Sequence, residues 1–369
     1  MRFTDLYSLL IRNESAKAVL TLNSFGLIRL VLATAVVVHH SLDLSGLGSP
    51  NIFGGFDLGT IGVAGFFAVS GFLLLGSSNR LGTRAFLKRR FFRLFPGLWM
   101  CLIVSAFVLV PFANYFSTYE STMRLVGLEN SSLTFVVLNS ALIVVQDSIG
   151  TVFSQNPFPN AVNGSLWTLA PEFICYLGLL VAAILSRRRL GIQLVLIVFA
   201  LIASCIAWIF TFESQLEIYS NFINPASGVA IAFCTGAILA ILIEYKPFRP
   251  NLVTTLIGLV IWALVGVAGP LSIIFLSLFV IFLGMSLVKP SFSRIGQNTD
   301  LSYGIYLYHW PIIQVFLATT TFGWSTNYSL ALLSLLTLTI SGLFAYASWT
   351  LVEKPSISFA RKDNLKTKN

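Results

Sequence analysis

The chain has 369 residues, of which 56% are hydrophobic and 10% are charged, and its formal net charge is +9. With a mean hydropathy of +0.85, it has too little polar surface for a soluble globule of this size. The long apolar runs predict an all-α fold, a polytopic integral membrane helical bundle. Membrane orientation explains the basic excess, and no nucleic-acid partner is indicated.

Eleven apolar runs follow the first 23 residues, which resemble an interfacial amphipathic helix more than a cleaved signal peptide. Because Lys and Arg accumulate in short cytoplasmic loops, eleven crossings would place Arg187 to Arg189 opposite the basic loop Arg80 to Arg93. The run 132–147 is the shortest, so we assign it as a re-entrant or interfacial segment. About ten transmembrane helices remain, with the N- and C-termini cytoplasmic. The runs lie at residues 24–42, 60–76, 95–112, 132–147, 165–185, 191–211, 224–243, 251–269, 271–288, 301–320 and 329–351.

No internal repeat or separate soluble domain is visible. We expect an N-terminal cytoplasmic or interfacial segment at 1–23, a membrane domain at 24–353 and a cytoplasmic tail at 354–369. The four cysteines lie in apolar segments, without a CxxC pair or a Cys/His cluster, so no metal site or disulfide framework is indicated. In this topology the outer loops carry the acids Asp43, Asp57, Glu120, Glu129, Asp147, Glu213 and Glu217.

An ionisable pair marks the first predicted span, where Arg29 precedes His40 by eleven residues. Eleven helical steps amount to three turns plus about 20°, so the two side chains share one face, about 16 Å apart along the axis. Ionisable groups inside a bilayer are costly unless they line a cavity or find partners. Each residue also has a structural interpretation. His40 can be a hydrogen-bonded polar residue at a helix end, and Arg29 can extend its guanidinium group to the membrane interface.

Glu172 lies about two turns into a span that begins near Ser165 and runs from outside to inside. His40 and Glu172 therefore both fall in the outer half of the membrane, where we expect them to meet. The alternative for Glu172 is a buried carboxylate that accepts hydrogen bonds from neighbouring hydroxyls.

Arg90 and Arg93, spaced i,i+3, precede the span that starts near Phe95. Two guanidinium groups on one helix face can grip a phosphate, although arginines here are also typical of a positive-inside anchor. His309 and Tyr306, also i,i+3, lie in a later span, either as a polar cluster or as part of a binding site. The glycines of the second span predict close helix packing, and Trp99, Trp310 and Trp349 fit interfacial anchors.

The order of these motifs resembles the bacterial membrane acyltransferase family 3, over about residues 20 to 360. Members of that family O-acylate sugars of surface and secreted polysaccharides. The motifs are Arg29 with His40, Gly62 to Leu73, Arg90 to Trp99, Asn156 to Pro159, Asn163 to Glu172, Leu301 to Pro311 and Val352 to Pro355. One departure is Ala64, which stands where many members carry an acid.

The resemblance implies a cytoplasmic acyl-CoA donor, a carbohydrate acceptor (a polysaccharide or lipid-linked glycan) and a location in the bacterial inner membrane, among its lipids. We expect acetyl-CoA as the donor, with a larger acyl group such as succinyl as the alternative. We assign His40 and Glu172 as catalytic, with His40 as general base or acyl relay and Glu172 as its orienting carboxylate. Donor binding is assigned to Arg29, Arg90, Arg93, Tyr306 and His309, and acceptor binding to Asn163, Ser165 and Trp167. The alternatives are a transporter or flippase for a polysaccharide intermediate, or a non-catalytic scaffold of a glycan-assembly complex.

Overall fold

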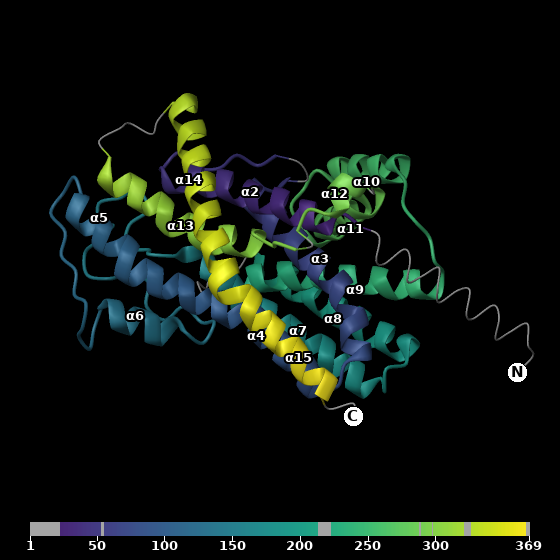
Figure 1. Ribbon diagram of the computed structural model, residues 1–369. Coiled ribbons are helices and arrows are strands. Elements are labelled where there is room, and N and C mark those ends of the chain that lie inside the picture. Colours follow the sequence, from purple (N-terminus) through teal and green to yellow (C-terminus); the bar gives the residue numbers. More distant parts are fainter. Residues whose placement is uncertain are drawn as a thin grey trace, which may run out of the picture.

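The computed structural model describes residues 23–52, 55–212, 223–287, 289–296, 298–320 and 326–366. All regular secondary structure in these ranges is helical, as the composition predicted (Figure 1). Of the predicted N-terminal segment, residues 1–22 lie outside the described ranges. The helices are α2 Phe25–Leu44, α3 Leu58–Arg80, α4 Thr83–Val104, η2 Ser105–Leu109, α5 Val110–Phe116, α6 Ser132–Asn139, η3 Gly164–Thr168, α7 Leu169–Leu185, α8 Leu190–Phe212, α9 Asn224–Tyr245, α10 Leu252–Val265, α11 Pro270–Ser286, α12 Pro290–Ser293, α13 Ser302–Thr319, α14 Asn327–Ser348, η5 Trp349–Glu353 and α15 Lys354–Lys366.

Seven helical segments are long and apolar enough to cross a bilayer: α2, α3, α4 with η2 and α5, η3 with α7, α8, α9, and α14 with η5 and α15. The shorter apolar helices α10 and α11 have 14 and 17 residues, and α13 has 18. Together these elements account for the predicted polytopic membrane bundle of about ten helices.

Helix α6 has eight residues and a length of about 12 Å, so it cannot span a hydrocarbon core of about 30 Å. A contact of Arg188 also indicates that this segment stays on one side of the membrane. Arg188 donates a hydrogen bond from Nη2 to the carbonyl of Leu81, at 2.8 Å, so the α7–α8 turn lies beside the α3–α4 turn. Since α4 leaves that side and α7 returns to it, the segment 117–163 stays on the other side. The prediction that run 132–147 does not cross the membrane is confirmed.

Glycines bring the central helices together, as predicted for the second span. A methyl group at Gly71 of α3 would overlap the carbonyl of Phe233 in α9. A methyl group at Gly236 of α9 would overlap the carbonyl of Ala68 in α3. The two backbones therefore pack in direct contact, the arrangement that small residues permit between membrane helices.

Helix α13 is buried on every side from Ser302 to Gln314. It continues through Pro311, which has no N–H to donate to the carbonyl of Leu307 one turn earlier. Asn163 satisfies that carbonyl with a hydrogen bond from Nδ2, at 2.9 Å. Trp310, expected at the interface, is 6% exposed and lies in the protein interior.

The chain ends in a long rod formed by α14, the π-helical η5 and α15, drawn in yellow in Figure 1. The predicted tail, 354–369, thus begins as a continuation of a membrane helix. Helix α15 packs beside α4, where the ammonium of Lys88 lies 4.5 Å from the centre of the Phe359 ring. This contact returns the end of the chain to the arginine-rich start of α4.

Candidate active site

The shared face predicted for Arg29 and His40 is confirmed by their contacts. Arg29 of α2 pairs with Asp300, just before α13, with 2.8 Å between Nη1 and Oδ2. His40 of α2 contacts His309 of α13, with 2.7 Å between Nδ1 and Nε2. Both side chains thus face the same segment of the chain, Arg29 near its start and His40 about two turns further on.

His40 belongs to a hydrogen-bonded histidine pair and lines what we call the histidine cavity, a space of about 320 Å³, while its partner His309 is fully buried. Nδ1 of His309 lies 2.7 Å from the carbonyl oxygen of Tyr306, which can only accept, so this nitrogen carries the hydrogen. In neutral His309 the other nitrogen, Nε2, is then an acceptor. His40 therefore donates from Nδ1, and its own Nε2 keeps a free lone pair.

A second histidine and a carboxylate lie on the same cavity wall. The rings of His39 and His40 are 4.8 Å apart between their centres, and Nδ1 of His39 lies 3.4 Å from Oδ1 of Asp57. Asp57 also caps α3 by accepting a hydrogen bond from the backbone N–H of Thr60, at 2.7 Å. Ala64, the departure from the family pattern, lines this cavity as well.

A neighbouring space of about 280 Å³, the arginine cavity, is lined by Arg29, Arg90 and Arg93 together with Glu172. Val63 and Tyr306 line both the arginine and the histidine cavity. Glu172 accepts a very short hydrogen bond from the hydroxyl of Tyr176. The expected contact between His40 and Glu172 is therefore wrong: within the described residues, His309 bonds to His40, and Glu172 accompanies the arginines.

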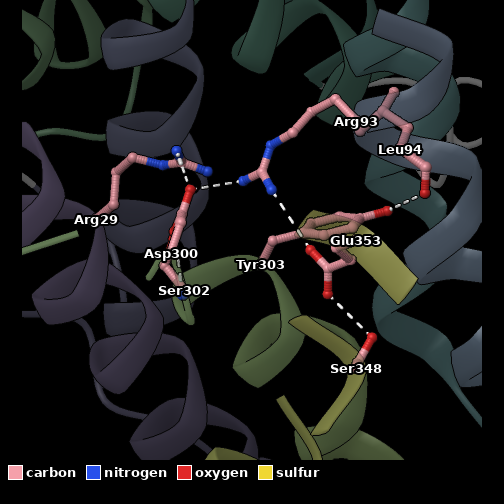
Figure 2. Close-up of polar contacts among 8 residues, drawn as sticks. All are labelled: Arg29, Arg93, Leu94, Asp300, Ser302, Tyr303, Ser348 and Glu353. Atoms are coloured by element: carbon pink, nitrogen blue, oxygen red, sulfur yellow. Dashed lines mark hydrogen bonds and ion pairs between the residues drawn. The ribbon is translucent and has the colours of Figure 1, made fainter. Parts of the chain in front are cut away.

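Asp300 links Arg29 and Arg93, two arginines of the arginine cavity (Figure 2). Its Oδ2 accepts from Arg29 and from Arg93, each at 2.8 Å, while Oδ1 accepts from the hydroxyl of Ser302, at 2.6 Å. Burial alone would raise the pKa of Asp300, but the two guanidinium groups lower it to about 2. Glu353 of η5 lies 3.5 Å from the other end of the Arg93 guanidinium.

Arg93 is consequently committed to two carboxylates, whereas Arg90 is not. The Nε atoms of Arg89 and Arg90 are buried without a hydrogen-bond partner. Both side chains, with Arg361 of α15, line a further space of about 260 Å³ that we call the basic pocket. Arg90 and Arg93 belong to the walls of both the basic pocket and the arginine cavity. Buried N–H groups of guanidinium side chains without a hydrogen-bond partner suit an anionic ligand.

The three predicted acceptor residues have different surroundings. Trp167 is 36% exposed and lines the histidine cavity. Asn163 and Ser165 are buried, and both bond to backbone carbonyls of α13, so they fasten η3 to that helix. Their assigned role in acceptor binding stays a prediction. The hydroxyl of Tyr306, predicted to bind the donor, donates to the carbonyl of Ser165, at 2.9 Å, and the residue lines both cavities.

Sequence reasoning missed three groups of the site: the Asp300 bridge, the His39–Asp57 pair, and the basic pocket with Arg89 and Arg361. A signal was present for Asp300, because it is an acid directly before a span that enters from the basic side. Such an acid needs a cationic partner. Nothing in the local pattern distinguished Arg89 from the other arginines of its loop.

Helices that enclose two neighbouring cavities, one lined by arginines and one by His39 and His40, define an integral membrane protein with a buried polar site. A family model described as an acyltransferase domain matches residues 22–346, and the chain belongs to this family, acyltransferase family 3. The resemblance seen in the motifs is thereby confirmed, and the chain is a membrane acyltransferase.

Two curated proteins are similar along nearly their whole length. One is named O-acetyl transferase, from Shigella phage Sf6; it is 29% identical over 344 residues, covering 90% of this chain and 95% of that protein. The other is named Nodulation protein 10, from Rhizobium leguminosarum bv. viciae; it is 29% identical over 363 residues, covering 91% and 93%. No solved structure matches the chain.

Proposed function

We propose that this membrane acyltransferase is an O-acetyltransferase of the bacterial cytoplasmic membrane. It takes acetyl from cytoplasmic acetyl-CoA and transfers it to a hydroxyl of a polysaccharide or lipid-linked sugar. The name of the phage Sf6 relative supports the reaction. The observation that carries the proposal is the hydrogen bond between His40 and His309, with His40 in a cavity that shares Val63 and Tyr306 with the arginine cavity.

The basic pocket and the arginine cavity suit the two ends of the donor. The phosphates of acetyl-CoA bind at the basic pocket, where Arg89 and Arg90 have unpartnered N–H groups. The thin pantetheine arm lies in the arginine cavity and brings the thioester toward Tyr306. Arg29 and Arg93 act indirectly, since both are paired with Asp300, which fixes their positions.

His40 supplies the base at the meeting point of donor and acceptor. Its Nε2 lone pair takes the proton of the acceptor hydroxyl while that oxygen bonds to the thioester carbon. The carbon–sulfur bond then breaks, and the proton passes from His40 to the departing thiolate. His309 holds the His40 ring and accepts a stronger hydrogen bond while His40 is charged. An acyl-histidine relay would use the same lone pair.

Many members of the family carry an acid at the position of Ala64. In this chain Asp57 supplies the carboxylate of the histidine cavity instead. It caps the helix that carries Ala64 and contacts His39, whose ring packs against His40. Glu172 belongs to the arginine cavity, where its negative charge partly offsets the positive charge of the arginines.

Transfer of label from radiolabelled acetyl-CoA tests this function. Membranes that contain the full chain should add alkali-labile label to the host's surface glycan, and membranes from a deletion strain should not. A transporter or a scaffold would leave the glycan unlabelled and would not bind acetyl-CoA. Absence of both labelling and acetyl-CoA binding would refute the proposal.

A further inference from the structure

A large groove lies in the segment between α5 and η3, on the side of the membrane opposite the arginines. Its volume is about 900 Å³, near the top of the range of about 300–1,000 Å³ for small-molecule sites. Figure 1 shows α5 and α6 at the same end of the bundle as the C-terminal half of α13. We call this space the loop groove.

The side chains that line the loop groove are carboxylates, amides and aromatic rings. Glu129 and Asp147 supply carboxylates, Asn130 and Asn160 supply amides, and the rings belong to Phe158 and Trp310. Among the described residues that line it, none is Lys or Arg. Carboxylates and amides accept hydrogen bonds from vicinal hydroxyl groups, and aromatic faces cover the apolar face of a sugar ring.

The wall of the groove is also a neighbour of the catalytic histidine. The ring of Trp310 lies edge-on to that of His40, with 4.8 Å between the ring centres. The same ring packs against Phe158, 5.4 Å away, on the groove side. A ligand in the groove is therefore separated from the histidine cavity by one tryptophan.

Helix α13 holds the groove in place. Trp310 donates from its indole nitrogen to the carbonyl of Ala161, at 3.2 Å. One turn later, Gln314 donates to the carbonyls of Phe158 and Ala161, each at 2.9 Å. The helix that carries His309 thus also fixes the loop that presents Phe158.

Backbone hydrogen bonds make the remaining wall rigid. The backbone N–H of Val162 donates to the carbonyl of Asp147, at 2.8 Å, and that of Gly150 to the carbonyl of Asn130, at 2.9 Å. Gln146, itself buried, bonds through Nε2 to the carbonyls of Ser131 and Ser148. A groove fixed in this way costs little ordering when it binds a ligand.

We propose that the loop groove binds the sugar units that neighbour the acceptor sugar in a neutral, hydroxyl-rich glycan. This inference rests on the proposed function and adds the acceptor's binding site and charge class. The acidic lining disfavours phosphate-bearing acetyl-CoA, which matches the basic pocket instead. The volume fits more than one sugar ring, so the groove binds the glycan units on either side of the modified sugar.

Steady-state kinetics with the full-length purified enzyme test the proposal. The acceptors are de-O-acetylated oligosaccharide fragments and monosaccharides from the host's surface polysaccharide, and released thiol reports turnover of acetyl-CoA. The test variants are Glu129→Gln with Asp147→Asn, and separately Phe158→Ala. Glu120→Gln is the control for loss of a carboxylate, because it removes one negative charge from an exposed position of the neighbouring segment.

We expect both test variants to raise the KM for oligosaccharides by about tenfold and to change kcat and the KM for acetyl-CoA by less than about twofold. Monosaccharides should be used equally by the variants and the wild type. The groove assignment is overturned if the oligosaccharide KM is unchanged, or if Glu120→Gln has the same effect. It is also overturned if the KM values for oligosaccharides and for monosaccharides rise equally. The same holds if the groove variants lose binding of a protein partner while the KM for the acceptor is unchanged.

The outcome is separable from that of the proposed function. Direct binding of the fragments to wild type and variants, measured by calorimetry without acetyl-CoA, should show the same loss of affinity. If the wild type binds fragments through the groove but no thiol is released from acetyl-CoA, the groove stands and the proposed donor fails. If thiol release is normal and the variants bind fragments like the wild type, the groove proposal fails alone.

Discussion

At His40 two successive hydrogen bonds decide which ring nitrogen is basic. The carbonyl of Tyr306 fixes the hydrogen of His309 on Nδ1, and His309 in turn draws the hydrogen of His40 onto its Nδ1. The arrangement resembles the base and orienting group of other acyl-transfer sites, with an imidazole in place of the usual carboxylate. A neutral orienting group avoids placing an isolated charge in the bilayer interior.

His309 should therefore act as a positioning residue. His309→Ala should lower kcat by about tenfold or more, since general-base catalysis contributes about 10²–10⁴-fold and part of it depends on orientation. His309→Gln keeps a side-chain acceptor for His40 and should recover part of the loss. The KM for acetyl-CoA should not change in either variant. Equal kcat values for His309→Ala, His309→Gln and the wild type would contradict this role.

Asp300 should stabilise the fold in a pH-dependent manner. Its pKa is lowered from 3.8 to about 2, so its contribution is complete above about pH 4 and is lost as the pH falls toward 2. The shift corresponds to about 2 kcal/mol at neutral pH. Asp300→Asn should lower the unfolding temperature in detergent at pH 6, and its deficit should shrink as the pH falls to 3. A deficit independent of pH would show that the charge of Asp300 is irrelevant.

Among the elements, the sequence predicted type and number better than register and partners. Hydropathy located the membrane helices because each must hide its backbone from lipid. The local pattern could not reveal which buried groups pair, since His309 and Glu172 were both plausible partners for His40. The choice depends on the packing of α13 against α2, which brings residues 269 positions apart into contact.

The contact of α3 with α9 offers a test at this scale. Gly71→Ala should destabilise the folded protein by about 2 kcal/mol. The added methyl group would overlap the backbone carbonyl of Phe233, which cannot move away as a side chain could. Gly178→Ala in α7 is the control, because a methyl group there meets no atom within 4 Å. The measurement is the loss of native tryptophan fluorescence on denaturation in mild detergent. Similar stabilities of the two variants would argue against a tight α3–α9 interface.

For the whole molecule, composition and loop charge were sufficient to predict a bundle with a non-crossing segment before α7. They were insufficient for the cavities, which arise where several helices meet and leave no local signature. The basic pocket, for example, requires Arg361 of α15 to return to Arg89 and Arg90 of α4.

Labelling with a membrane-impermeant maleimide in whole cells should test the orientation. Ser121→Cys should react from outside, whereas Gly82→Cys and Arg187→Cys should react only after the membrane is permeabilised. The natural cysteines lie in apolar helices, and the unmodified chain gives the background. If Gly82→Cys and Arg187→Cys reacted from opposite sides, the segment 117–163 would have to cross the membrane.

The central claim is that His40 takes the proton of the acceptor in a cavity that neighbours the donor site. The most direct measurement compares acetyl transfer from labelled acetyl-CoA to glycan by the wild type and by His40→Ala, with acetyl-CoA binding measured on the same samples. We predict that His40→Ala binds acetyl-CoA normally and that its transfer falls by about 10²-fold or more. Transfer at the wild-type rate by a folded His40→Ala protein would contradict the account.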